Sequence, residues 1–256
     1  MNDPRDDLIE LSRELGRPER DWVILGEGNT SAALDAERFL VKASGSELGS
    51  ATARNFVAVA AAPVLALLDA AEADDDEIRR CLMRARVDPG AEQMPSIETL
   101  LHAVCLRVPG VRFVAHTHPT AVNAVTCSQA FETALRGRLF PDEIVVCGPA
   151  PLLVPYADPG VPLARAVAAG LSTFTAEHGE PPRTIWMQNH GLVTLGTSAR
   201  HALDLTSMAT KLARILGGTM AFGGPRFLPQ VAVARIHRRP DELHRQRVRG
   251  HRPPTT

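Results

Sequence analysis

Hydrophobic residues follow helical spacing in some stretches of the chain and strand spacing in others. Between residues 97 and 108, apolar residues recur three and four positions apart, as on the buried face of a helix. Residues 111–118 show the alternation expected of a strand. Further helices are predicted at 6–15, 161–177 and 199–216, and an alanine-rich helix is predicted within residues 51–70. Short apolar runs predict strands at 21–25, 38–43, 144–147 and 152–154, with two more within 184–195.

The order of these elements indicates a single α/β domain. The strands at 21–25 and 38–43 flank a glycine-containing turn at 26–31 and are predicted to pair as a hairpin. Strands and helices do not alternate regularly, which argues against a doubly wound parallel sheet and favours a mixed, largely antiparallel sheet. Periodicity fades towards the C-terminus, so we expect a domain at residues 1–234 followed by a basic tail at 235–256.

Single residues mark where several helices are expected to begin. Ser96 and Ser198 stand directly before helical runs, where a hydroxyl can accept a hydrogen bond from a backbone N–H of the first turn. Pro119 is suited to open the helix that follows the strand at 111–118, because proline is tolerated in a first turn.

Composition limits the classes of protein to consider. The chain has 256 residues, of which 45% are hydrophobic and 22% charged, so a sizeable buried core is expected. A net charge of −1 excludes a strong global field for nucleic acid or an anionic membrane, and we expect the acidic run at 74–77 to be solvated surface. No uncharged apolar run reaches the ~20 residues of a membrane span. The polar N-terminus and four cysteines without CxxC spacing favour a reduced, cytoplasmic protein.

Three histidines are the strongest candidates for a metal site. His116 and His118 stand two positions apart on a predicted strand, so their rings project from the same face and can reach one ion. His190 lies in a turn with Asn189 and Gly191, where a side chain can be aimed into a cleft. Three imidazoles with an open fourth position are typical of catalytic zinc. Taken alone, such a pair of histidines is more often two polar residues at a strand end that bond to backbone or water. A structural zinc is disfavoured, because no fourth Cys or His ligand is evident.

Two residues are candidates for proton transfer. Glu98 lies in the first turn of a predicted helix, where a carboxylate is stabilised by the helix dipole, but near a metal it could also exchange a proton with a substrate. Tyr156, the only tyrosine, lies in a turn-rich segment. It is either a packing aromatic or a phenol that donates a proton to a developing alkoxide.

Small polar residues at predicted turns could bind a phosphate. Backbone N–H groups exposed by glycine, together with hydroxyls, suit a dianion, although each cluster alone is also ordinary turn chemistry. Lys42 could add charge there or lie on the surface. The clusters are Gly28-Asn29-Thr30-Ser31, Ser44-Gly45 and Ser96.

The ordered combination of these motifs resembles the class II aldolase/adducin family from about residue 6 to residue 218. The segments GEGNTS and PSIETLLHA are most similar to the aldolase portion of rhamnulose-phosphate aldolase/alcohol dehydrogenase fusions, and we expect no dehydrogenase portion here. Ile97 stands where several sugar-phosphate aldolases carry a second serine, which weakens the case for tight phosphate binding. The motifs are Gly28–Ser31, Ser44–Gly45, Pro95–Glu98, His116–His118, Tyr156 and His190–Gly191.

The resemblance implies a three-layer α/β/α fold and a homotetramer with active sites between subunits. It implies that Glu98 is the acid/base residue and that Tyr156 assists at the aldehyde oxygen, as in fuculose-phosphate aldolases. The ligands of Zn²⁺, or of another divalent metal, would be His116, His118 and His190. The phosphate pocket would be lined by Gly28, Asn29, Ser44, Gly45 and Ser96.

The predicted function is that of a zinc-dependent lyase acting on a small-molecule sugar phosphate or sugar acid. It would cleave a ketose phosphate or a related hydroxy-carbonyl compound by a retro-aldol reaction through a metal-stabilised enediolate. The alternatives are a 4-epimerase, decarboxylase or dehydratase that shares this chemistry, or a non-catalytic adducin-like interaction module. The three histidines disfavour the interaction module, and neither nucleic acid nor a membrane is an expected partner.

Overall fold

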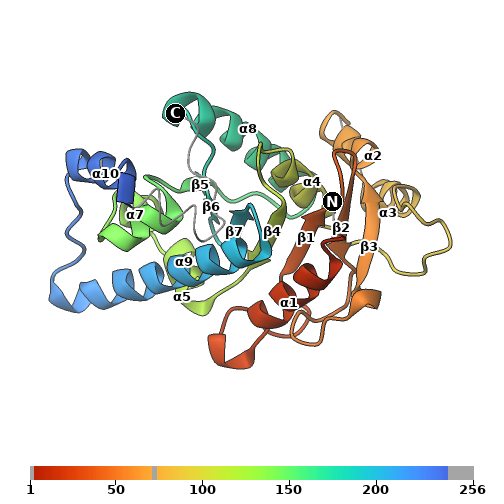
Figure 1. Ribbon diagram of the computed structural model, residues 1–256, viewed down its shortest axis with the longest axis horizontal. Coiled ribbons are helices and arrows are strands. Elements are labelled where there is room, and N and C mark those ends of the chain that lie inside the picture. The colour runs from red at the N-terminus through yellow and green to blue at the C-terminus, as the bar shows by residue number, and fades with distance from the viewer. Residues whose placement is uncertain (1–2, 71–73, 242–256) are drawn as a thin grey trace.

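A mixed β-sheet forms the centre of the molecule (Figure 1). The computed structural model describes residues 3–70 and 74–241. Among these residues, seven strands form one sheet in the order β3-β2-β1-β4-β7-β6-β5. Neighbouring strands are antiparallel except β5 and β6, which are parallel. The strands are β1 (Asn29–Ala33), β2 (Arg38–Lys42), β3 (Phe56–Ala60), β4 (Phe113–Thr117), β5 (Leu152–Val154), β6 (Thr184–Met187) and β7 (Gly191–Gly196).

Helices cover both faces of the sheet, which gives the predicted three-layer α/β/α arrangement. The helices are α1 (Arg5–Leu15), α2 (Ala61–Leu65), α3 (Asp75–Arg84), α4 (Thr99–Leu106), α5 (Thr120–Thr126), α6 (Phe131–Leu135), α7 (Pro141–Cys147), α8 (Val161–His178), α9 (Ala199–Thr219) and α10 (Gln230–His237). The short 3₁₀ helices are η1 (Pro18–Arg20), η2 (Ala53–Asn55), η3 (Ala66–Leu68) and η4 (Met220–Phe222).

Strand alternation divides the core into two layers. In β2, Phe39 and Val41 pack in one cluster with α2, α4 and α8, while Leu40 packs in a second cluster with α1. A third cluster joins α5, α6 and α9 to Trp186 of β6 and Leu192 of β7. The central strands therefore bury both of their faces. Among the described residues, no helix is long and apolar enough to cross a membrane.

The segment 21–25 is not the predicted strand. Asp21 and Leu25 have left-handed backbone conformations, with φ of 57° and 52°, which an extended strand cannot accommodate. The segment is a loop in which the Trp22 carbonyl accepts a hydrogen bond from the His118 N–H at 2.9 Å. The hairpin partner of β2 is β1, formed by residues that the sequence placed in a turn. Asn29, Thr30 and Ser31 are buried although they are polar, so the strand shows no hydrophobic alternation from which it could be predicted.

Tertiary contacts override local preference at two further places. The helix predicted within residues 51–70 is present as α2, but Phe56–Ala60 before it form strand β3, whose backbone pairs along the whole of β2. The predicted strand at 144–147 belongs to helix α7, in which Pro141 occupies the first turn. Arg183 donates hydrogen bonds to the carbonyls of Val145 and Val146 at the end of this helix, at 2.8 and 3.0 Å.

The helix starts were predicted with mixed success. Ser198 caps α9 by accepting a hydrogen bond from the His201 N–H at 3.1 Å, and Pro119 directly precedes α5, so both predictions are confirmed. Ser96 is not the N-cap of α4, because that helix begins at Thr99 with Glu98 in the N-cap position. Ser96 instead accepts a hydrogen bond from the Glu98 N–H at 3.3 Å.

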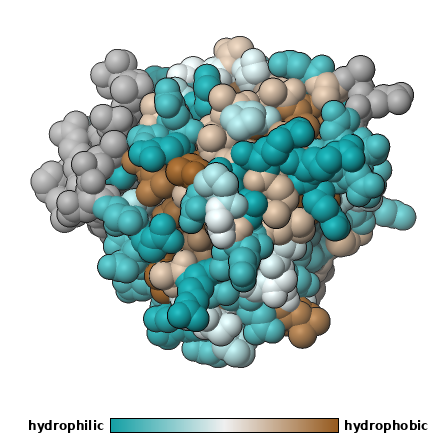
Figure 2. All heavy atoms as spheres, turned by 90° about the vertical axis from the view of Figure 1, so that its right-hand side faces the viewer, coloured by the Kyte–Doolittle hydropathy of each residue, from teal (hydrophilic) through white to brown (hydrophobic). Residues whose placement is uncertain are grey.

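The acidic run predicted to be solvated surface lies at the start of α3 and is exposed. Asp74 caps this helix by accepting a hydrogen bond from the Glu77 N–H at 2.7 Å. The side of the molecule that carries β3 and α3 is largely hydrophilic, with scattered apolar side chains between the polar ones (Figure 2). The run therefore has a local structural explanation.

Helix α10 extends the packed structure past the predicted end of the domain at residue 234. Val233 and Ile236 pack against Ile144 and Val145 of α7. His237 Nε2 lies 2.7 Å from Oε1 of Glu180. Residues 242–256, most of the predicted tail, lie outside the described residues, so the division into domain and tail remains a prediction.

Candidate metal centre

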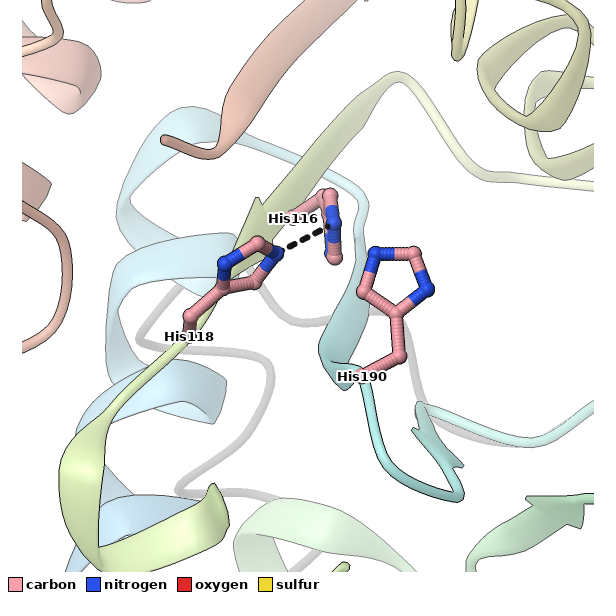
Figure 3. Close-up of side chains that lie close together, drawn as sticks. All are labelled: His116, His118 and His190. Atoms are coloured by element: carbon pink, nitrogen blue, oxygen red, sulfur yellow. Dashed lines mark hydrogen bonds between the residues drawn. The ribbon is translucent and has the colours of Figure 1, made fainter. Parts of the chain in front are cut away.

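Strand pairing brings three histidines together. His116 is in β4, His118 follows it directly, and His190 lies in the turn between β6 and β7. Because β4 pairs with β7, the two ends carrying these residues are adjacent. The three rings face a common point (Figure 3), and one ring nitrogen from each lies within 4.8 Å of the others. The predicted histidine cluster therefore forms within one chain.

Two unusual backbone positions make this approach possible. A β-carbon on Gly191 would lie 2.7 Å from both Cδ2 of His118 and the carbonyl oxygen of Thr117, too close for any side chain. Asn189 adopts a left-handed conformation, with φ of 53°, and its N–H donates to the Thr126 carbonyl at 3.1 Å. The tight turn and the missing side chain together set His190 against β4.

The geometry of the cluster fits a divalent ion. Nε2 of His116 lies 2.9 Å from Nε2 of His118. Nitrogens about 2.0–2.1 Å from a tetrahedral zinc ion would lie slightly farther apart than this, so small side-chain movements suffice. His116 Nδ1 lies 3.0 Å from the Leu192 carbonyl. A hydrogen bond from Nδ1 leaves the Nε2 lone pair free for a metal, as is usual for metal-binding imidazoles.

Glu98 lies beside the same point. Its Oε1 is 3.4 Å from Nε2 of His116 and 3.2 Å from Nε2 of His190. Burial disfavours the charged carboxylate, but attraction to His116 and hydrogen bonds to Glu98 hold its pKa well below the usual range. The same carboxylate raises the pKa of His116 against the opposing effect of burial. A carboxylate and three imidazoles thus share one site.

His118 is held in the neutral form that a metal ligand requires. Burial, together with the neighbouring His116 and His190, lowers the pKa of His118 to about 3. Glu27 Oε2 lies 3.8 Å from its Nδ1. A cavity of about 440 Å³ opens beside this ring. Its lining residues are Asp21, Val23, Ile24, Glu27, His118, Thr120, Asn123 and Ala124.

The structure also places the residues predicted to bind phosphate. Asn29 Nδ2 lies 2.6 Å from Glu98 Oε2 and 3.4 Å from the Ser96 hydroxyl, so these three residues are in contact. The Ser44 N–H donates to the Met94 carbonyl at 2.8 Å, which sets the loop of Ser44 and Gly45 beside the segment that leads to Ser96.

Gly28 has a packing explanation. Its φ is 65°, and a β-carbon there would lie 2.7 Å from the His116 carbonyl oxygen. Lys42 is buried rather than on the surface, and burial lowers its pKa. Its ammonium group donates to the carbonyl of Gly26 at 3.1 Å and to that of Ser46, which ties the loop before β1 to the loop after β2. Phosphate binding by these loops remains a prediction.

The hydroxyl of Tyr156 bonds to a residue outside the histidine cluster. Its side chain is 57% exposed, and its hydroxyl donates to Asp158 Oδ1 at 2.9 Å. That hydrogen bond raises the pKa of Tyr156. Its backbone N–H donates to Oε1 of Gln188 at 3.1 Å, close in sequence to His190. The geometry within one subunit therefore does not pair Tyr156 with Glu98.

His102 was not predicted to take part in the site, although it lies on the helix that begins directly after Glu98. His102 instead contacts Asn29 and Ser31 through its two ring nitrogens. The signal was present, because His102 follows Glu98 by four positions and Ser31 follows Asn29 by two, which are the spacings of a shared helix face and a shared strand face.

The chain belongs to the class II aldolase and adducin family. The Class II Aldolase and Adducin N-terminal domain matches residues 6–216, which confirms the resemblance drawn from the motifs. The sequence is 30% identical over 239 residues to the uncharacterized oxidoreductase YuxG of Bacillus subtilis (strain 168), covering 88% of this chain but only 32% of that protein. It is 26% identical over 209 residues to the 3-oxo-tetronate 4-phosphate decarboxylase of Haemophilus influenzae, covering 80% of this chain and 85% of that protein.

A solved structure agrees with this assignment. The N-terminal class II aldolase domain of a conserved protein from Thermoplasma acidophilum superposes with a TM-score of 0.65 at 26% identity, covering 84% of this chain and 94% of that chain. The predicted fold class is thereby confirmed.

Proposed function

We propose that this chain catalyses a metal-dependent lyase reaction, the retro-aldol cleavage of a ketose phosphate or a related hydroxy-carbonyl compound. One observation carries the proposal. Three imidazole nitrogens within 4.8 Å of one another stand beside the Glu98 carboxylate, whose Oε1 is 3.2 Å from His190 and 3.4 Å from His116. A divalent ion held by the three histidines supplies a Lewis acid for the electron pair left on the substrate when the carbon–carbon bond breaks.

The role proposed for Glu98 is to exchange the proton at the carbon that receives this electron pair. The carboxylate is ionised in the resting site, as its lowered pKa requires, and one of its oxygens faces the cluster. A base must lie within hydrogen-bond reach of the proton it transfers. A substrate bound beside His116 and His190 would meet that condition, because Glu98 Oε1 lies 3.4 and 3.2 Å from their Nε2 atoms.

The substrate's anionic group is proposed to bind at the loops of Gly28–Asn29 and Ser44–Gly45 together with Ser96. Contacts between Asn29 and Ser96, and the buried ammonium of Lys42 between these loops, support a site for negative charge on this side of the metal. Ile97 offers no hydroxyl to such a group, so the substrate class extends to sugar acids as well as sugar phosphates.

The proton at the aldehyde oxygen is assigned to Tyr156 within a homotetramer. Its exposed side chain is available to a neighbouring subunit, and it makes no hydrogen bond to the described residues of the cluster in its own chain. Sedimentation of the purified protein tests the assembly, and a monomer with full lyase activity would exclude this role.

Decarboxylation is the second candidate, favoured by the similarity to 3-oxo-tetronate 4-phosphate decarboxylase. It uses the same site, because loss of CO₂ leaves an electron pair next to the same carbonyl group. Metal-loaded protein should be incubated with ketose phosphates and with 3-oxo sugar acids, and the products analysed for aldehyde and for CO₂. Aldehyde release supports the lyase proposal, CO₂ release supports the second candidate, and an inert, metal-free protein contradicts both.

A further inference from the structure

A chain of buried hydrogen bonds leads away from the second oxygen of Glu98. Asn29 Nδ2 lies 2.6 Å from Glu98 Oε2. The other end of the same amide, Oδ1, contacts Nε2 of His102. Nδ1 of His102 lies 2.7 Å from the hydroxyl of Ser31. All four side chains are buried, so these contacts do not compete with solvent.

The chemistry of the carboxylate fixes the direction of every hydrogen in this chain. An ionised Glu98 only accepts hydrogen bonds, so the Asn29 amide must present its NH₂ group to it and its oxygen to His102. Nε2 of His102 must then carry the proton, and Nδ1 must accept from the Ser31 hydroxyl. Burial lowers the pKa of His102 to about 3, which is consistent with this neutral form.

The backbone holds the four residues in register. Asn29 and Ser31 lie two positions apart in β1 and project from the same face of the strand. Glu98 and His102 lie four positions apart at the start of α4, one turn of the helix from each other. Two pairs of neighbours on rigid elements therefore face each other, which leaves the amide of Asn29 little freedom to turn.

We infer that His102 is a positioning residue for Glu98, acting through the amide of Asn29. This inference rests on the proposed role of Glu98 as the proton-transfer group. The relay keeps Glu98 Oε2 engaged, so that only Oε1 faces His116 and His190. Without this hydrogen bond, the carboxylate could rotate and present both of its oxygens to a metal. The second oxygen would then occupy the position that the substrate needs.

The inference also changes the role expected of Asn29. Its two Nδ2 hydrogens point to Glu98 and to the Ser96 hydroxyl, and its oxygen is taken by His102. The amide therefore orients the Glu98 carboxylate and makes a longer contact to Ser96. A phosphate at this pocket would meet the backbone N–H groups of the loops rather than a free Asn29 side chain.

The test compares two substitutions at His102. His102→Leu removes both hydrogen bonds, while His102→Gln can donate to the Asn29 oxygen and accept from the Ser31 hydroxyl. His201→Leu is the matched control, because His201 is also buried but lies at the start of α9 and contacts Thr197. All variants are compared with the wild-type protein after their thermal unfolding has been recorded.

Two readouts separate positioning from general damage. In zinc-loaded protein, His102→Leu should lower kcat on the order of 10–100-fold with KM little changed, and His102→Gln should restore most of the loss. Nuclear magnetic resonance of the Asn29 side-chain NH₂ group, assigned with Asn29→Asp, should show two distinct, exchange-protected protons in wild type and His102→Gln. The same protons should lose their protection in His102→Leu and keep it in His201→Leu.

The NMR readout does not depend on lyase activity, so it stands even if no substrate is turned over and the proposed function fails. Unchanged Asn29 protons in a folded His102→Leu protein would overturn the inference. It would equally be overturned if His201→Leu lost as much kcat as His102→Leu, because the effect would then be general.

Discussion

Oε1 of Glu98 lies 3.2 Å from Nε2 of His190, although one residue precedes α4 and the other lies in the turn between β6 and β7. The same oxygen is 3.4 Å from Nε2 of His116. A carboxylate at this place could exchange a proton with a substrate bound in the site. No single sequence motif predicts this contact, because the residues come from distant segments of the chain.

Replacing Glu98 separates proton transfer from metal binding. Glu98→Gln keeps the size of the side chain and an acceptor oxygen for the Asn29 amide but removes its basicity, so turnover should fall roughly 10²–10⁴-fold while metal content stays the same. Glu92→Gln, the same change at an exposed position six residues earlier, should alter neither quantity. Metal analysis and initial rates on both proteins provide the check, and full activity in Glu98→Gln would remove the proposed role.

Gly191→Ala should disrupt the cluster through packing alone. The new β-carbon would lie 2.7 Å from Cδ2 of His118 and from the Thr117 carbonyl oxygen, so the ligands must move apart. We expect zinc affinity to fall by about tenfold or more, comparable with the loss of a supporting contact at a metal site. Gly217→Ala in α9, where no atom lies within 4 Å of the added carbon, should leave zinc affinity unchanged. Calorimetric zinc titration of both variants decides the matter; equal affinities would contradict the packing argument.

A buried ion pair should control stability away from the active site. Arg138 Nη1 lies 2.7 Å from Glu143 Oε1, and both side chains are almost completely inaccessible to solvent. Removing the carboxylate leaves the buried positive charge of Arg138 without a partner charge. Glu143→Gln should therefore lower the free energy of unfolding by about 3–5 kcal/mol. The i,i+4 pair of Arg200 and Asp204 in α9, whose arginine side chain is exposed, is the contrast, and Asp204→Asn should cost only about 0.3–0.5 kcal/mol. Urea unfolding measures the loss of stability in both variants, and similar losses would contradict the prediction.

The docking of α10 should make stability depend on acidity. The hydrogen bond from His237 lowers the pKa of Glu180 in the folded protein against the effect of burial. The ionised carboxylate therefore contributes stability that is complete above the usual carboxyl pKa and is lost as the pH falls through the lower folded value. Glu180→Gln should lower the urea midpoint near neutral pH and lower it less near pH ~4. Glu177→Gln, an exposed change in the last turn of α8 and three residues before Glu180, should leave the pH dependence as in wild type.

Much of this fold can be predicted from the sequence wherever a helix has one buried face. Helices α1, α8 and α9 were predicted within a few residues because their apolar stripes pack directly on the sheet. The first strands were misplaced for a physical reason. Asn29, Thr30 and Ser31 are buried polar residues whose hydrogen-bond partners lie elsewhere in the fold. The Thr30 hydroxyl is 2.7 Å from that of Ser12 in α1, and Asn29 and Ser31 both contact His102 of α4. Hydrophobic alternation cannot reveal such a strand.

The candidate site was also predictable only where local spacing determines it. The spacing of His116 and His118 on one strand was sufficient to predict that their rings share a face. The approach of His190 could not be derived from spacing, because it depends on the pairing of β4 with β7 and on the space left by Gly191.

Metal binding by the cluster is the most direct test of the account. Protein stripped with a chelator should be titrated with Zn²⁺, first as wild type and then as His190→Ala, which removes the ligand brought in by tertiary structure. The account predicts one tightly bound zinc ion per chain in the wild type and its loss in a folded His190→Ala protein, while His178→Ala, an exposed histidine on α8, retains it. Equal zinc binding by wild type and His190→Ala, or none by either, would contradict it.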